Sequence, residues 1–252
     1  MDRRLEVAIA AARAAGEVAL RYFRTGLEVE RKHDRSPVTI ADREAEQRAV
    51  AVLREAFPQH GILGEEFGEQ AGSEARWIID PIDGTKSFIR GIPFFATLIA
   101  LEEEGEITTG AMYAPALDDL LYAQKGQGAY DRQGRLHVSS IDKLSRSMLV
   151  FGGASALRGS GYWHAYERLV DRSNRQRAYG DFFGYTFVAR GQAEAMIDVD
   201  LKPWDLAALQ IIIEEAGGCF TDFSGRATAF GGTAIASNRL VHEEIRRLIT
   251  TA

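Results

Sequence analysis

The most constraining feature of this chain is the stretch of residues 77–88, which reads W-I-I-D-P-I-D-G-T-K-S-F. Its first three residues are bulky and apolar, and such a run is typical of a buried strand. Asp80 and Asp83 follow at the point where this strand should end. Pro81 lies between them and disfavours a helix through Asp80, because proline restricts the residue that precedes it to extended geometry. The stretch therefore predicts a buried strand with two carboxylates at its carboxyl end.

The turn after this strand adds groups that can bind an anion. Gly84 and Thr85 predict a tight turn whose backbone N–H groups are free to face a ligand. Carboxylates hold hard metal ions, while amides and a hydroxyl hold phosphoryl oxygens, so the combination suits a phosphate bridged by divalent cations. The alternative is a plain turn in which Asp80 and Asp83 cap backbone N–H groups. This stretch alone leaves both interpretations open.

Composition limits the class of protein. The 252 residues, 46% hydrophobic and 26% charged, are typical of a soluble globular protein with one large domain or two small ones. Acidic residues exceed basic ones, 36 against 30, which argues against a nucleic-acid partner. Cys219 is the only cysteine, so an internal disulfide is excluded and a reducing compartment is favoured. The apolar run at residues 91–101 is too short to span a bilayer, so we expect a cytoplasmic protein with no membrane partner.

Hydrophobic periodicity predicts helices and strands along the whole chain. The predicted helices cover residues 4–24, 42–57, 162–170, 180–190, 205–216 and 239–250. The predicted strands cover residues 76–80, 95–101, 107–113, 120–124, 148–151, 195–199 and 233–236. Thr39 precedes Asp42 by three residues, as in a capping box, and a polar connection is expected at residues 27–38. Helices that flank two strand-rich regions favour an α/β or α+β fold.

Three further segments accompany the central stretch. They are T-I-A-D at residues 39–42, G-E-E at 64–66 and P-W-D at 203–205. With W-I-I-D-P-I-D-G-T they resemble the inositol monophosphatase-like family of Mg²⁺-dependent, lithium-sensitive phosphatases, from about Arg13 to the C-terminus. The resemblance implies a layered α-β-α-β-α sandwich of the inositol monophosphatase/fructose bisphosphatase type. It also implies a single domain at residues 1–252, with a metal and phosphate half at about 1–145 and a substrate half at 146–252.

The resemblance further implies a site for two to three Mg²⁺ ions, with Mn²⁺ as the alternative ion. Glu65, Asp80 and the backbone carbonyl of Ile82 would hold the first ion. Asp80, Asp83 and Asp205 would hold the second, and a third, weaker ion would touch Glu65. Carboxylates gathered in this way either take up protons or bind cations, and ligands that are all oxygen favour Mg²⁺ or Mn²⁺. For Asp205 a plain helix N-cap is the alternative.

Catalytic and phosphate-binding roles are also implied by the resemblance. Thr85, with Asp42 behind it, is similar to the pair of residues that takes the proton of the attacking water in this family. The resemblance implies Glu65, a metal ligand, as the third catalytic residue. Asp83 and the amides of Gly84 and Thr85 would receive the phosphate. Asp42 has the alternative role of a plain helix cap.

The turn region distinguishes branches of the family. D-G-T-K-S-F followed by I-R-G-I-P resembles the histidinol-phosphate phosphatase branch, as do L-K-P-W-D at residues 201–205 and Y-G-D at 179–181. Inositol monophosphatases usually carry T-N-F in the turn, and the nucleotide-bisphosphate branch K-E-F. The chain departs from the branch at Phe182 and Phe183, where a cysteine and an aromatic residue are common. The resemblance implies hydrolysis of L-histidinol phosphate in histidine biosynthesis; an inositol-1-phosphate or broad-specificity phosphatase, or a non-catalytic regulatory binding protein, is the alternative.

The residues on the leaving-group side are expected to be Gly180, Asp181 and Asp198. The first two match the substrate loop of the family, and Asp198 is the acid seven residues before the last metal ligand. Two acids suit a leaving group that carries an ammonium, because opposite charges attract. A surface turn for Asp181 and a strand-end acid for Asp198 are the alternatives. The partners implied are a small phosphorylated metabolite and a second copy of the chain in a homodimer.

Overall fold

The computed structural model describes residues 2–31, 37–73 and 75–250. Its helices are α1 (Arg3–Tyr22), α2 (Ile40–Ala56), α3 (Thr85–Phe88), α4 (Ala154–Gly159), α5 (Trp163–Arg172), α6 (Asp181–Ala189), α7 (Pro203–Glu215) and α8 (His242–Thr250), with the 3₁₀ helix η1 (Leu144–Arg146). Its strands are β1 (Glu30–Arg31), β2 (Pro37–Val38), β3 (Gly61–Gly64), β4 (Gly68–Gln70), β5 (Ala75–Asp83), β6 (Ala96–Glu103), β7 (Glu106–Ala114), β8 (Asp119–Gln124), β9 (Gly128–Asp131), β10 (Gly134–Arg135), β11 (Met148–Phe151), β12 (Arg175–Arg177), β13 (Ala195–Val199), β14 (Cys219–Thr221) and β15 (Thr233–Ser237). Residues 32–36 of the predicted polar connection, including Lys32, to which we assign no role, lie outside the described residues.

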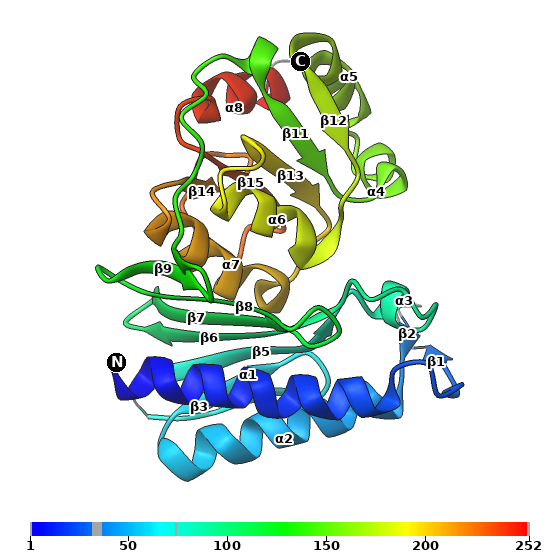
Figure 1. The fold of residues 1–252 in the computed structure, drawn as a ribbon, viewed down its shortest axis with the longest axis vertical. Coiled ribbons are helices and arrows are strands. Elements are labelled where there is room, and N and C mark those ends of the chain that lie inside the picture. The colour runs from blue at the N-terminus through cyan, green and yellow to red at the C-terminus, as the bar shows by residue number, and fades with distance from the viewer. Residues whose placement is uncertain (1, 32–36, 74, 251–252) are drawn as a thin grey trace.

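These elements form five layers (Figure 1). Helices α1 and α2 cover one face of an eight-stranded sheet of order β10-β9-β8-β7-β6-β5-β3-β4. Helices α6 and α7 fill the space between this sheet and a five-stranded sheet of order β12-β11-β13-β15-β14. Helices α4, α5 and α8 cover the outer face of the second sheet. The predicted α-β-α-β-α sandwich is confirmed.

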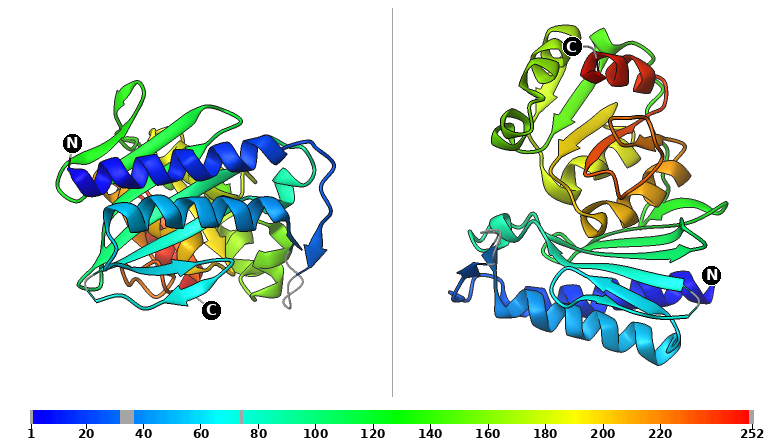
Figure 2. Two further views of the ribbon diagram at one scale, coloured as in Figure 1. Left: turned by 90° about the horizontal axis from the view of Figure 1, so that it is seen from below. Right: turned by 180° about the vertical axis from the view of Figure 1, so that it is seen from behind.

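The two sheets come from the two halves of the chain, as the views from below and behind also show (Figure 2). Arg190 at the end of α6 joins the halves through ion pairs to Asp119 at 2.7 Å and Asp131 at 3.1 Å. The division into one domain with two sub-regions stays a prediction. Within the described ranges, no helix is long and apolar enough to cross a membrane.

Strand β5 runs three residues beyond its predicted end, through Pro81 to Asp83. Its pairing with β6 shifts register between Asp80 and Asp83, so Pro81 lies in an irregular step where no ladder N–H is needed. The shift has a consequence for side-chain direction. Residues three apart in a regular strand point to opposite faces, and the irregular step allows Asp80 and Asp83 to face the same side.

Candidate active site

Three carboxylates from distant parts of the chain meet at the carboxyl end of β5. Oxygens of Asp80, Asp83 and Asp205 all lie within 4.8 Å of one another. Asp80 is almost fully buried and Asp205 is partly buried, in the first turn of α7. Asp205 is the third residue of α7 and not its N-cap, although its Oδ2 accepts the backbone N–H of Lys202 at 2.7 Å. The predicted grouping of these three acids is therefore present in the structure.

Burial and mutual repulsion both act against ionisation of this cluster. Burial raises the pKa of Asp80 well above its usual value, and the charge of Glu65 raises it further. Burial and the charge of Asp181 raise the pKa of Asp83 in the same way. Burial raises the pKa of Asp205 to about 6. A cluster of oxygen donors that resists ionisation when alone is suited to a hard divalent cation, which favours the ionised carboxylates.

Glu65 lies beside the cluster, directly after β3. Its backbone N–H donates to the carbonyl of Ile79 at 3.2 Å, which continues the pairing of β3 with β5. Its charge acts on both Asp80 and Asp205, yet Glu65 is not among the three acids whose oxygens lie within 4.8 Å. The structure therefore brings Glu65 next to the cluster that the other three acids form.

The turn after β5 is held by side-chain hydrogen bonds. Thr85 Oγ1 donates to the carbonyl of Ile82 at 2.9 Å, and it lies 3.4 Å from Asp42 Oδ1. Asp42 Oδ2 accepts both the backbone N–H and the hydroxyl of Thr39, each at 2.7 Å. Asp42 therefore closes the capping box of α2, which was the alternative role, and it also contacts Thr85, while its catalytic role stays a prediction. Gly84 has φ +84°, and a Cβ atom there would lie 2.7 Å from the carbonyl oxygen of Phe94, so glycine is required.

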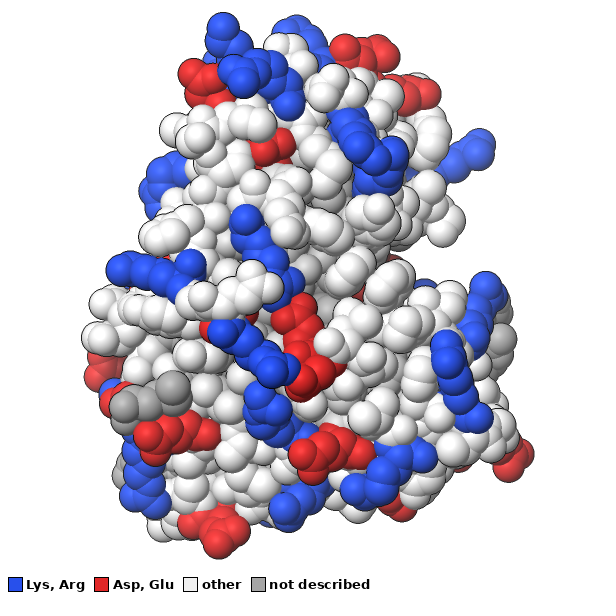
Figure 3. Space-filling view, in the orientation of Figure 1, with Lys and Arg blue, Asp and Glu red and all other residues white. Residues whose placement is uncertain are grey.

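The residues predicted for the leaving-group side lie at the start of α6 and on β13. Asp181 is the first residue of α6, and its Oδ2 is 3.4 Å from the position of a Cβ atom on Gly84. Asp198 is the residue before the last of β13 and is only 6% exposed, so it is a buried acid near a strand end. Burial raises the pKa of Asp198 to about 7, and the charge of Asp181 contributes. Gly180 is the N-cap residue of α6. The space-filling view shows a notch in the outline on the α3 side, between the parts that carry the two sheets (Figure 3).

Two residues that support the site were not predicted. A Cβ atom on Gly152 would lie 2.0 Å from Asp198 Oδ1, so this glycine makes room for the carboxylate. Glu46 is fully buried in α2, and its carboxylate accepts the N–H groups of Glu66 at 2.8 Å and Phe67 at 3.1 Å. Each had a signal in the sequence. Gly152 follows a predicted strand, and Glu46 is a charge on the apolar face of a helix, which is rare without a partner.

The likeness to known proteins covers the whole chain. A model of the inositol monophosphatase family matches residues 1–251. The chain belongs to the inositol monophosphatase family. A histidinol-phosphatase of Chlorobaculum parvum is 41% identical over 235 residues, 92% of this chain and 91% of that protein. A fructose-1,6-bisphosphatase/inositol-1-monophosphatase of Thermotoga maritima is 36% identical over 252 residues, 99% and 96% of the two chains. The crystal structure of the extragenic suppressor protein suhB from Bartonella henselae superimposes with a TM-score of 0.93 at 32% identity, with 100% of both chains covered.

Membership of this family fixes the class of reaction. The family is metal-dependent and acts on small phosphorylated substrates, so the chain is a phosphatase, a phosphoric monoester hydrolase. The acidic cluster of Asp80, Asp83 and Asp205 fits the metal requirement, because its donors are all oxygen. The predicted family and fold are thereby confirmed.

Proposed function

We propose that the chain is a Mg²⁺-dependent histidinol-phosphatase, which hydrolyses L-histidinol phosphate to L-histidinol and phosphate in histidine biosynthesis. The observation that carries this proposal is a pair of acids whose charges interact: Asp181 lies next to the turn at Gly84, and Asp198 lies against Gly152. L-Histidinol carries a primary ammonium, and two carboxylates on the leaving-group side provide opposite charge for it. The names of the histidinol-phosphatase relatives support the same substrate.

The proposed metal ligands are Glu65, Asp80, Asp83, Asp205 and the carbonyl of Ile82, for two Mg²⁺ ions and a weaker third, with Mn²⁺ as the alternative ion. When bound, the ions would supply Lewis-acid activation of water and neutralise negative charge that develops on the leaving oxygen. We take Asp80 as the shared ligand from the family resemblance; one of its oxygens lies within 4.8 Å of those of Asp83 and Asp205, and the charge of Glu65 raises its pKa. Lithium inhibition is part of the same proposal.

The residues of the chain itself would position the phosphate and move a proton. The amides of Gly84 and Thr85 would donate to phosphoryl oxygens beside Asp83, and in the part of the chain that the structure describes neither amide donates to a protein acceptor. Thr85 Oγ1 would take the proton of the attacking water and pass its own proton to Asp42 Oδ1, 3.4 Å away. The raised pKa of Asp42, caused by its burial, makes that carboxyl a better proton acceptor than an exposed aspartate.

The candidate substrates differ in the charge of their leaving groups. The name of the Thermotoga maritima relative refers to inositol 1-phosphate, whose leaving group is a neutral polyol, and to fructose 1,6-bisphosphate, whose leaving group is an anionic sugar phosphate. A neutral polyol gains less from the two acids, since one charge-assisted contact contributes about 1.5–3 kcal/mol. We therefore expect L-histidinol phosphate to be preferred over myo-inositol 1-phosphate by at least about tenfold in kcat/KM.

Parallel kinetics on L-histidinol phosphate, myo-inositol 1-phosphate and a nucleotide bisphosphate test the proposal. Asp198→Asn should narrow the preference, mainly by raising KM for L-histidinol phosphate. The matched control is Asp200→Asn, which removes a nearby but exposed charge and should keep the preference. Equal rates on all three substrates would indicate a broad-specificity phosphatase, and a preference for inositol phosphate would overturn the proposed substrate. Absence of phosphate release from any of them with Mg²⁺ would favour a non-catalytic binding protein.

A homodimer and a cytoplasmic location complete the proposal. The homodimer follows from the family resemblance alone, and the cytoplasmic location from the composition of the chain, with its single cysteine. Light scattering of the purified protein tests the homodimer, and a mass of 27.8 kDa in solution would contradict it.

A further inference from the structure

Tyr185 carries a buried polar atom that the proposed mechanism does not use. It lies on α6, four residues after Asp181 and therefore on the same side of that helix. The residue is only 2% exposed, and its hydroxyl has no hydrogen-bond partner among the residues that the structure describes. A buried phenol normally finds a partner, because an unmet hydroxyl loses its bonds to water without replacement. The unpaired hydroxyl of Tyr185 suggests that a bound ligand supplies its hydrogen-bond partner.

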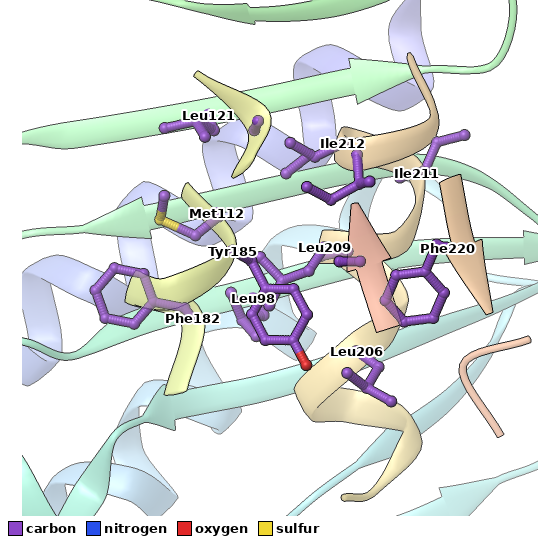
Figure 4. Close-up of a cluster of buried hydrophobic side chains, with 14 of the residues drawn as sticks. Leu98, Met112, Leu121, Phe182, Tyr185, Leu206, Leu209, Ile211, Ile212 and Phe220 are labelled. Carbon is purple, nitrogen blue, oxygen red and sulfur yellow. The ribbon is translucent and has the colours of Figure 1, made fainter. Parts of the chain in front are cut away.

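Packing fixes the position of this hydroxyl. The Tyr185 ring packs near Phe220, with centroids 6.5 Å apart, inside the hydrophobic cluster between the two sheets. Its oxygen points away from Leu209 and toward the first turn of α7, where Leu206 follows the cluster acid Asp205 (Figure 4). A ring held in this way cannot turn its oxygen to bulk solvent.

Helix α6, which carries Asp181 and Tyr185, packs closely on β13, the strand that carries Asp198. A Cβ atom on Gly184 would lie 2.5 Å from Sδ of Met196, so α6 can pack this tightly on β13 only with glycine there. Asp198 follows Met196 by two residues and lies on the same face of the strand. Burial raises the pKa of Tyr185, and the charge of Asp198 raises it further, more than the charges of the other acids do. The phenol is therefore neutral.

We propose that Tyr185 determines specificity: its hydroxyl is the third hydrogen-bond acceptor for the ammonium of the leaving group, beside the carboxylates of Asp181 and Asp198. An ammonium has three N–H donors, and two carboxylates and one hydroxyl oxygen satisfy all three. This assignment rests on the proposed leaving-group side of the site, and it predicts a preference for phosphate esters of amino alcohols.

The test is Tyr185→Phe, which removes one oxygen and keeps the ring. Michaelis parameters are measured for L-histidinol phosphate and phosphoethanolamine, which carry an ammonium, and for glycerol 2-phosphate, which does not. We expect KM for both ammonium-bearing esters to rise about tenfold with kcat little changed, and kcat/KM for glycerol 2-phosphate to change less than about twofold. The melting temperature without ligand should stay the same or rise, because an unpaired buried hydroxyl has been removed. The control Tyr130→Phe removes an exposed hydroxyl, which donates to the carbonyl of Gln127, and should match wild type.

Three results would overturn this assignment. An equal loss of kcat/KM on all three esters would show that Tyr185 supports the site as a whole. No change on any ester would show that the hydroxyl is not used, and a lowered melting temperature without a change in KM would show a structural role. The proposed substrate is tested separately by wild type alone: if wild type prefers inositol phosphate, that proposal fails, while the ratio of variant to wild type on phosphoethanolamine still decides the role of Tyr185.

Discussion

The carboxylate of Glu46 occupies the space that a side chain at position 64 would need: a Cβ atom on Gly64 would lie 1.9 Å from Glu46 Oε1. Glu46 comes from α2 and is fully buried, and it accepts the backbone N–H groups of Glu66 and Phe67. These bonds hold the segment that follows β3 and therefore the position of Glu65. The glycine of the G-E-E segment is thus explained by a buried acid that lies eighteen residues earlier in the chain.

Gly64→Ala should move Glu46 and loosen the segment that carries Glu65. We expect a loss of about 1–3 kcal/mol in the free energy of unfolding, as for other overpacked interiors, together with weaker Mg²⁺ binding. Urea denaturation and Mg²⁺ titration measure the two effects. The matched control is Gly159→Ala, because a Cβ atom there meets no atom within 4 Å, and it should be neutral. Wild-type stability and Mg²⁺ affinity in Gly64→Ala would contradict the role of Glu46.

The sequence predicted the elements that have a strong pattern. The apolar run before Asp80 gave β5, and Thr39 with Asp42 gave the capping box of α2. Strand β12, R-Q-R at Arg175–Arg177, was missed because two exposed arginines and a glutamine show no hydrophobic pattern. The other missed strands, β1, β2, β3, β4, β9, β10 and β14, have two to four residues each, too few for a period to be detected.

The site was predicted less completely than the fold, because its geometry depends on contacts between distant segments. The motifs identified Asp80, Asp83 and Asp205, but nothing local indicated the register shift that allows the first two to face the same side. The fit of Asp198 against Gly152 could not be predicted either, since it requires β11 and β13 to be neighbours. Pairing between strands that are far apart in sequence is not encoded in either strand alone.

Asp80→Asn and Asp205→Asn should each abolish turnover while the fold stays intact. Asparagine keeps an oxygen for the N–H of Ile82 in the first case and for that of Lys202 in the second. Each change removes a charge from a cluster whose pKa values are raised by burial, so the melting temperature without metal should rise. Phosphate release at saturating Mg²⁺ and thermal unfolding in EDTA measure the two effects. Near wild-type activity in either variant would contradict the metal assignment.

The protein without metal should lose stability as the pH rises from about 4 to about 7. The pKa of Asp198 is raised to about 7 and that of Asp205 to about 6, so the folded state binds their protons more tightly than the unfolded state does. Their contribution is complete below the unfolded pKa near 4 and is lost as the pH passes the folded values, by up to about 1.4 kcal/mol per pH unit for each group. Mg²⁺ should reverse this loss at pH 8.

Urea denaturation in EDTA at pH 5 and pH 8 tests this pH dependence on wild type and Asp198→Asn. His242 acts in the opposite direction, because burial lowers its pKa to about 4, so the informative quantity is the difference between the two proteins. We expect wild type to lose more stability than the variant between the two pH values. Parallel behaviour of the two proteins would show that Asp198 ionises as freely in the folded state as in the unfolded chain.

Thr85 should matter for the chemical step more than for binding. Thr85→Ala removes the hydroxyl that lies between the carbonyl of Ile82 and Oδ1 of Asp42, and in the proposed mechanism this hydroxyl takes the proton of the attacking water. We expect kcat to fall by about 10²–10⁴ with KM little changed, and Thr85→Ser to restore most of the rate because it keeps the hydroxyl. The matched control is Thr97→Ala, which removes a buried hydroxyl that donates to the carbonyl of Pro81 at 2.8 Å and should lower stability but leave kcat nearly unchanged. Steady-state kinetics of the three variants decide the matter: a kcat for Thr85→Ala close to that of Thr97→Ala would show that the hydroxyl only holds the turn.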